Sequence, residues 1–310
     1  MAKYYKKRGD NTLLNSQTLC FEWLRSKKED VKPSTYDKYE MIINNYLISF
    51  FDNNSLEQLN INIIKDYLMK LLNKGLSSSV VKTIKNVLKA IYTTYENQYG
   101  FNHIDFSLVK IEEEKKETEY LTNKQFKQLH QYCLNKNNDI CLSILLAMDT
   151  GMMIGEIVAL KVSDIDLENQ LIHISKRAQR TKNDDIGSKT IYEVYDVEWP
   201  MLRDITIPKE LFFYLQEYLK DKESDCYLTS NLYVVSEVTK LQRGLDRIGS
   251  KYGFKTTFKD LRNMYKERCL KSCMDMNILM ELLGVQSLKL NLPENYKSSN
   301  EEKKRQVNKL

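Results

Sequence analysis

A strongly polar segment, KIEEEKKETEYLT, interrupts this chain of 310 residues. It starts at Lys110 and has almost no apolar content, whereas helical apolar patterns precede it and resume at Leu121. A segment of this kind cannot be buried in a core and is typical of a linker between domains. The length of the chain also favours two domains. We therefore expect a linker at residues 108–120 with a separate hydrophobic core on each side.

Before the linker, apolar residues recur at helical spacing in four segments. The first is expected to begin at Asn15 or Ser16, and it has a single apolar stripe: Leu19, Cys20, Trp23 and Leu24. The second is expected to begin with Ser34 as its cap, and the third to end at Gly75. Four helices of this length predict a small bundle at residues 12–107, preceded by a basic tail at residues 1–11.

After the linker, helical patterns flank a central region that alternates like β-strands. Thr122 is expected to cap the first helix. LENQLIHISKRAQRT and SKTIYEVYDVEWPMLRDITIP predict a hairpin or a small three-stranded sheet. With only four prolines and ten glycines, the composition is that of a mostly helical protein. The predicted fold is mainly α with a small β-sheet (α+β), with one domain at residues 121–296 and a charged tail at 297–310.

The cysteines and the apolar runs restrict the class of protein. Six cysteines are scattered without a CxxC pair, which indicates a reducing compartment and neither a disulfide framework nor a zinc site. No apolar run approaches the length of a membrane span, and MAKYYKKRGD is polar throughout. We expect a soluble, cytoplasmic protein without metal or membrane contact. The net charge of +5 is compatible with almost any soluble protein.

Several phrases of the sequence follow one another in a characteristic order. They are WLRSKKEDVKPSTYDKYEMIINNYLISFF, LLNKGLSSSVVKTIKNVLKAIYTTY, TGMMIGEIVALKVSDIDLEN, RDITIPKEL, FKDLRNMYKERCL and ELLGVQSL. In this order they resemble the tyrosine recombinases, the phage and conjugative-transposon integrases. The first two phrases resemble the helical core-binding (SAM-like) domain of that family, and the others resemble its catalytic domain. The resemblance spans residues 12–296, nearly the whole chain.

This resemblance implies a particular way of acting on DNA. Family members form a C-shaped clamp on double-stranded DNA, with one domain on each side. A tyrosine attacks a phosphodiester to give a transient 3′-phosphotyrosyl link, without metal, ATP or another cofactor. Strand exchange takes place in a homo-tetramer in which the C-terminal segment packs onto a neighbour. We expect the same partners here.

One motif of the family departs from its usual form at Met153. The family pattern is Thr-Gly-apolar-Arg-x-Gly-Glu, and the arginine contacts the scissile phosphate. Four positions fit this pattern and fix the register: Thr150, Gly151, Gly155 and Glu156. Met153 takes the place of the arginine, so a charge is missing. The preferred interpretation of Met152 and Met153 is core filling at a helix junction, for which methionine is well suited.

Three further catalytic positions are also substituted. Counting back from Arg203 puts Trp199 at the position of the family's β-hairpin lysine. The His-x-x-Arg motif appears as Lys259-Asp260-Leu261-Arg262, and the second family histidine is replaced by Val285. The only histidines of the chain are His103, His130 and His173, so no shift of register restores either one.

Two catalytic positions keep their residue type. Arg262 is expected to hold a backbone phosphate, although a helix-start arginine paired to Asp260 or Glu267 is the alternative. Tyr296 is the candidate nucleophile, two residues further from the Leu-Gly motif than is typical. Because the chain contains twenty tyrosines, chance is the alternative at this position.

Basic residues in both domains are the candidates for contact with DNA. Lys82, Lys85 and Lys89 recur on one side of the fourth helix, where a solvated surface is the alternative. The other candidates are Arg177, Arg180, Lys182 and Lys259. Lys259, Lys176, Arg177 or Lys182 could also supply a contact or a proton that the substituted positions have lost.

Three functions compete for this sequence. The preferred one is a DNA-binding member of the recombinase family in which cleavage is impaired or lost. The alternative is an active integrase that forms its intermediate through Tyr296 with substitute cations. A helical protein-interaction module that no longer binds DNA is the third, and the retained basic residues argue against it.

Overall fold

The structure is a computed structural model that describes residues 4–6, 13–112, 120–182 and 190–288. It divides into two compact units. The first comprises Met1–Glu119 and Gln179–Glu193, and the second comprises Tyr120–Ala178 and Val194–Leu310. The sequence predicts contiguous domains, and the segment Gln179–Glu193 departs from that prediction.

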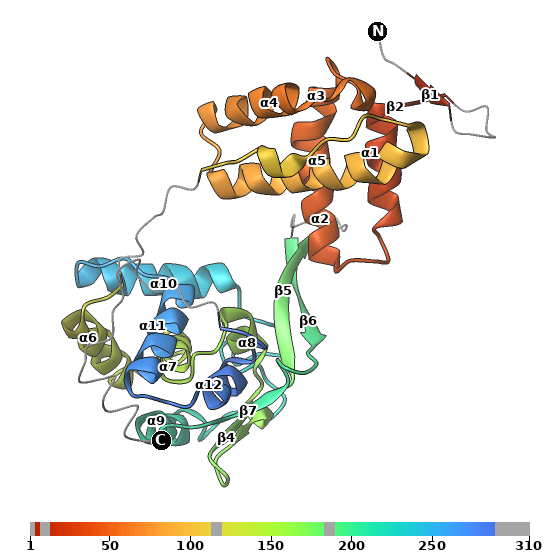
Figure 1. The fold of residues 1–310 in the computed structure, drawn as a ribbon. Helices are drawn as coiled ribbons and strands as arrows, with labels where there is room; N and C mark the ends of the chain where they lie inside the picture. The colour runs from red at the N-terminus through yellow and green to blue at the C-terminus, as the bar shows by residue number, and fades with distance from the viewer. Residues whose placement is uncertain (1–3, 7–12, 113–119, 183–189, 289–310) are drawn as a thin grey trace. The chain divides into compact units, whose positions relative to one another are not determined.

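The first unit is a helical bundle, as the apolar spacing predicts. Its main helices are α1 (Ser16–Ser26), α2 (Pro33–Ile42), α3 (Ile48–Phe51), α4 (Ile61–Asn73) and α5 (Ser78–Tyr99) (Figure 1). Short 3₁₀ turns lie at Leu56–Gln58 and Phe106–Leu108. The predicted stripe of α1 is buried in the common core, and Asn15 caps this helix by accepting the N–H of Thr18. Gly75 follows α4 with a left-handed φ of 88°, so the predicted stop is confirmed.

Three features of this unit differ from the sequence prediction. The cap of α2 is Lys32 and not Ser34, because Pro33 takes the first helical position, where its fixed φ and missing N–H are tolerated. The predicted second helix is interrupted by a π-helical turn at Ile43–Leu47. Two short strands, β1 (Tyr4–Lys6) and β2 (Leu13–Asn15), pair antiparallel at the N-terminus, where a tail was expected.

The second unit is built around one almost fully buried helix. This is α7 (Asp139–Thr150), which contacts α6 (Asn123–Leu134), α8 (Ile154–Ala159), α9 (Lys209–Tyr218), α10 (Val238–Lys251) and α11 (Phe258–Lys271) (Figure 1). The predicted cap Thr122 is confirmed, and it forms a capping box with Gln125. Helix α12 (Met276–Leu283) packs against α11 and against strand β7 (Arg203–Thr206).

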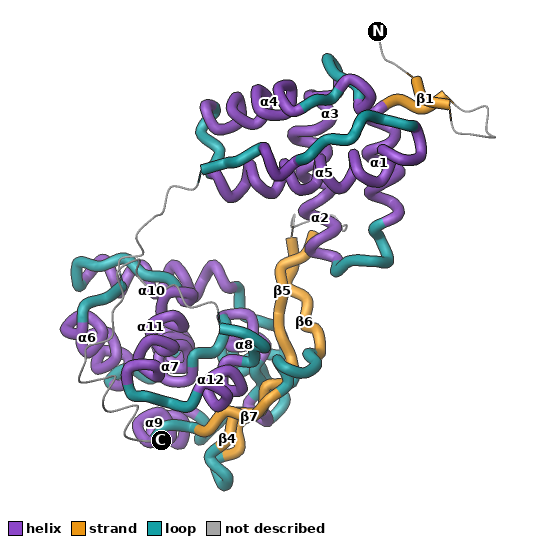
Figure 2. The backbone as a smooth tube through the Cα atoms, in the orientation of Figure 1, coloured by secondary structure: helices purple, strands orange, loops and turns teal. Residues whose placement is uncertain are grey.

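The strands of the second unit form a small sheet and part of a ribbon (Figure 2). Strands β3 (Ile165–Asp166), β4 (Leu171–Ile174) and β7 form an antiparallel sheet in that order. Strands β5 (Lys176–Lys182) and β6 (Thr190–Asp196) form a separate two-stranded ribbon, inserted between β4 and β7. The predicted hairpin and the predicted three-stranded sheet are therefore both present, and the fold class is mainly α with small antiparallel sheets.

Candidate functional site

The turn between α7 and α8 requires a glycine because of its backbone conformation and its close approach to a neighbouring ring. Gly151 ends α7 with a φ of 68°, and a Cβ there would lie 2.3 Å from the ring of Tyr265. Met152 is fully buried, so its interpretation as a core residue is confirmed. Met153 is only half-buried and caps α8 through its backbone, so core filling is the wrong interpretation for this residue. Its backbone N–H donates to the Oε2 atom of Glu156 at 2.8 Å.

A buried ion pair fixes the first turn of α8. Glu156 accepts two hydrogen bonds from Arg203, at 2.9 and 3.0 Å, and the two side chains are 0% and 2% exposed. The Nε of Arg203 donates to the carbonyl of Leu282 at 2.8 Å, and its Nη1 also donates to the carbonyl of Met201. This pair therefore joins α8, β7 and α12. No motif in the sequence analysis predicts it, because the partners lie 47 positions apart and are of a common type.

Arg262, near the start of α11, points into the same region. Its Nη1 donates to the carbonyl of Gly151 at 2.5 Å and its Nη2 to that of Leu283 at 2.7 Å. Burial lowers the pKa of Arg262, the charge of Glu156 raises it, and the charges of Arg203 and Arg177 lower it. Among the residues that the structure describes, Arg262 has no ion-pair partner. The carboxylate of Asp260 instead accepts hydrogen bonds from the backbone N–H and the hydroxyl of Thr257, the N-cap residue of α11. The predicted alternative of an ion pair between Arg262 and Asp260 is therefore wrong.

The remaining catalytic positions make none of these hydrogen bonds. Lys259 is exposed on the first turn of α11. Val285 follows α12 and packs against the small core of Cys269, Leu279 and Leu283. Trp199 is 75% exposed in the connection from β6 to β7, where it precedes a cis proline. The predicted nucleophile Tyr296 lies outside the described residues.

The predicted DNA contacts fall into two groups. Lys82, Lys85 and Lys89 all lie within α5, so their spacing of three and four residues sets them along one side of the helix. The pKa of Lys85 is lowered first by burial and then by the charges of Lys82 and Lys89. Lys85 also donates to the carbonyl of Val109 at 2.9 Å, a structural role that the spacing does not predict. On β5, Arg177 is half-buried, and the exposed Arg180 donates to Thr190 at 2.8 Å. The side chain of Lys182 lies outside the described residues.

A second ion pair joins His130 to Asp149, the residue directly before the Thr-Gly motif. The Nε2 of His130, on α6, is 2.9 Å from a carboxylate oxygen of Asp149. This hydrogen bond raises the pKa of His130, burial opposes the rise, and the charges of Asp149 and Glu210 add to it. The charge of Arg268 lowers the pKa. Arg268 lies over the ring of Phe126 and donates to the carbonyl of Met148.

This group gives an expected pH dependence of stability. Because its pKa is raised in the folded state, protonated His130 stabilises the protein fully below its ordinary pKa of about 6.5. The contribution is lost as the pH rises through the raised value. Urea unfolding is therefore expected to show a difference between wild type and His130→Gln that is largest at acidic pH and shrinks as the pH rises. His103→Gln, which alters an exposed imidazole, is the control. A difference independent of pH would contradict this assignment.

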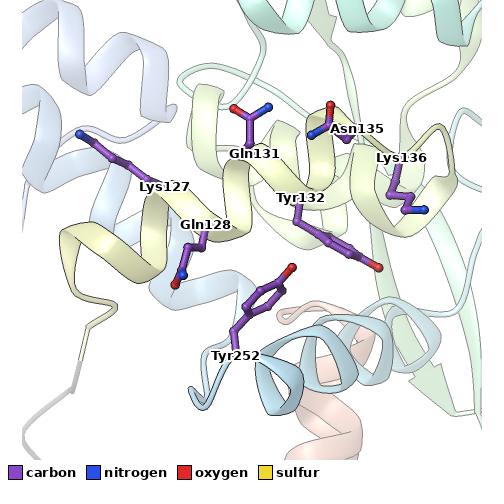
Figure 3. A pocket seen from close by; sticks show the side chains of 7 residues that line it. All are labelled: Lys127, Gln128, Gln131, Tyr132, Asn135, Lys136 and Tyr252. Atoms are coloured by element: carbon purple, nitrogen blue, oxygen red, sulfur yellow. The ribbon is translucent and has the colours of Figure 1, made fainter.

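A pocket of 530 Å³ lies on α6 at the end of α10 and shares no residue with the arginine site. Figure 3 shows Tyr132 and Tyr252 facing one another in it, and their rings meet edge to face with centroids 5.9 Å apart. Lysines and amide side chains complete the lining: Lys127, Gln128, Gln131, Asn135 and Lys136. None of these residues belongs to a motif of the sequence analysis.

The described residues lack two further features, a cluster of metal ligands and a membrane-spanning helix. They contain no group of three or more histidine, cysteine, aspartate or glutamate side chains that could hold a metal ion. None of their helices is both long and apolar enough to cross a membrane.

Family models match both parts of this chain. A model of the N-terminal SAM-like domain of phage integrases matches residues 17–72, and the model of the phage integrase family matches residues 119–303. The second match alone covers more than half of the chain. The protein therefore belongs to the phage integrase family, and the resemblance stated from its motifs is confirmed.

Two of the proteins with similar sequences are named as a tyrosine recombinase and an integrase. A protein of Caldanaerobacter subterraneus subsp. tengcongensis, called a tyrosine recombinase XerC-like protein, is 27% identical over 86% of this chain and 74% of its own length. The integrase of Staphylococcus phage L54a is 28% identical over 57% of this chain and 56% of its own length.

Solved structures of integrases share the fold. The Tn1549 transposon integrase, in complex with a circular intermediate DNA, matches 94% of this chain and 98% of its own with a TM-score of 0.77 and 16% identity. A lambda integrase tetramer bound to a Holliday junction matches 90% of this chain and 79% of its own, with a TM-score of 0.62 and 14% identity. At these identities the likeness establishes the fold alone.

Proposed function

We propose that this protein binds double-stranded DNA as a site-specific recombinase of its family does, and that its strand cleavage is impaired or lost. The observation that carries the proposal is the composition of the site. The neighbouring residues of the family motifs are retained and form two hydrogen-bonded pairs, Glu156 with Arg203 and Gly151 with Arg262. In the same turn, the half-buried Met153 has a thioether where the family has a guanidinium.

The chemistry explains why the substitutions matter more for cleavage than for binding. Phosphodiester transfer passes through a pentacoordinate state whose extra negative charge must be met by fixed donors. Methionine has no donor. The leaving 5′ oxygen also needs a proton, and neither the indole of Trp199 nor the alkyl side chain of Val285 can supply one at neutral pH. Binding of an intact duplex relies on contacts to its phosphates and base edges, and it needs neither a donor to the transition state nor a proton for a leaving group.

The assembly on DNA is part of the same proposal. Relatives of this fold are seen on DNA, and the lambda integrase is a tetramer on a Holliday junction. We propose a homo-tetramer in which the C-terminal segment contributes to contacts between subunits, as the family resemblance implies.

An active integrase is the second candidate. It is favoured by Lys259, whose ammonium group is exposed and has no ion-pair partner among the residues that the structure describes. A flexible ammonium at this position could reach a bound phosphate and partly replace the missing histidine. The nucleophile of such an enzyme would be Tyr296.

DNA binding is tested by a gel shift with short duplexes over a range of salt concentrations. Affinity is expected to fall steeply with salt, because phosphate contacts release counterions. The double substitution Lys82→Ala/Lys89→Ala is expected to weaken binding and to reduce the slope of log K against log salt by about 2, or about 1 per phosphate contact. The matched control is Lys65→Ala/Lys70→Ala, which alters two exposed lysines of α4.

Two outcomes would contradict the proposed function. Absence of a salt-dependent shift in the wild-type protein would favour a protein-interaction module. Equal losses of affinity in the α5 and α4 variants would show that Lys82 and Lys89 do not mark the side of the first unit that faces DNA.

A further inference from the structure

The charges around Glu156 do not balance. Arg203 and Glu156 neutralise one another in a buried, bidentate ion pair. Two further guanidinium groups, those of Arg262 and Arg177, act electrostatically on this site. Neither has an ion-pair partner within the described part of the chain. Cationic groups that are partly desolvated and unpaired are costly unless an anion joins them.

Arg177 lies directly against the glycine of the first turn of α8. A Cβ at Gly155 would lie 2.6 Å from the carbonyl oxygen of Ala178, so the backbone of β5 passes this turn at a distance that only glycine permits. The same Cβ would lie 3.4 Å from the Cγ of Arg177 and 3.5 Å from its Nε. The guanidinium is thus held beside the motif in which Met153 replaces arginine, two residues before Gly155.

The Nε of Arg177 has an unmet hydrogen bond. This atom is buried and has no hydrogen-bond partner among the residues that the structure describes. A buried donor without an acceptor is unfavourable, and such groups in native proteins call for an explanation. Arg180, three residues further along the ribbon, is by contrast exposed and bonded to Thr190.

We propose that Arg177 is the second guanidinium of the phosphate site and takes over the contact that Met153 cannot make. The ligand is one phosphate of a DNA backbone, held between Arg177 from β5 and Arg262 from α11. The proposal rests on the proposed function, because it specifies how the same site binds its substrate. Under this proposal the site keeps its ability to bind a phosphate, through Arg177 and Arg262. It still lacks the proton donors that strand cleavage needs.

Inorganic phosphate is the probe that tests this site without DNA. A ligand that binds only the folded state raises the melting temperature, and the rise grows with the logarithm of the ligand concentration relative to its Kd. Titration with phosphate against chloride at equal ionic strength therefore reports binding. The wild-type protein is expected to be stabilised by phosphate. Arg177→Gln is expected to weaken phosphate binding by about ten- to a hundredfold, the loss of one charge-assisted contact. Arg243→Gln, which alters an exposed arginine of α10, is expected to bind phosphate like the wild type.

Rescue distinguishes a replaced contact from a general loss of positive charge. In the double variant Met153→Arg/Arg177→Gln, the guanidinium returns to the family position and phosphate binding is expected to recover. The proposal is overturned if phosphate does not stabilise the wild type or if Arg177→Gln binds as well as the wild type. It is also overturned if Arg243→Gln loses as much affinity as Arg177→Gln, or if Met153→Arg gives no recovery. Gel shifts of the same variants report the proposed function separately, since many lysines outside this site contribute to DNA affinity.

Discussion

Replacing Arg203 by methionine is expected to lower the free energy of unfolding by about 3–5 kcal/mol. The substitution leaves the carboxylate of Glu156 fully buried and without its only cationic partner among the described residues. It also removes the hydrogen bonds from Arg203 to the carbonyls of Leu282 and Met201. Urea unfolding measures this loss directly.

Two comparisons show whether the effect comes from the buried pair. Arg243→Met, on an exposed position of α10, is expected to change the stability by no more than about 0.5 kcal/mol. In Glu156→Leu/Arg203→Met the loss is expected to be smaller than in Arg203→Met alone, because no unpaired charge remains. A loss below about 1 kcal/mol in Arg203→Met would contradict a structural role for this ion pair.

Strand cleavage is expected to be slower by several orders of magnitude than in a family member with every catalytic residue. Loss of one oriented donor to the developing charge costs about a hundred- to a thousandfold in rate. Loss of a positioned proton donor costs about a hundred- to ten-thousandfold more. The two factors do not simply multiply, because the residues act on one transition state.

The proposed role of Arg177 changes how this deficit is divided. If Arg177 meets part of the phosphate charge, Met153→Arg is expected to restore little of the rate. Trp199→Lys, which returns a proton donor to the connection before β7, is expected to restore more. Single-turnover cleavage of one duplex by the two variants compares them. A larger gain in Met153→Arg than in Trp199→Lys would show that charge, and not proton transfer, limits the reaction.

Local sequence signals account for much of the fold. The apolar stripe of α1, the cap at Thr122 and the glycine after α4 all follow from short-range rules, and the structure has them where they are predicted. The π-helical turn at Ile43–Leu47 was not predicted, because its residues have the same apolar spacing as an uninterrupted helix. Ser34 was misassigned because Pro33 offers a competing start to the same helix.

The site was predictable only in part. The Thr-Gly motif locates Met153 and Glu156 by their spacing, and the surviving Arg262 donates a hydrogen bond to Gly151 of the same motif. The ion pair of Glu156 with Arg203 and the approach of Arg177 to Gly155 depend on contacts between distant segments, which spacing along the chain does not encode. Half-burial distinguishes Met153 from its neighbour Met152, and periodicity at a helix junction cannot separate the two.

Covalent capture on a nicked suicide duplex tests most directly whether this protein binds DNA but has lost strand cleavage. The duplex is built on the sequence that the protein selects from a random pool, so that binding is established first. We expect a salt-sensitive complex and, on a denaturing gel, almost no protein linked to DNA over hours. A covalent adduct that forms within minutes and is absent in Tyr296→Phe would show a working integrase.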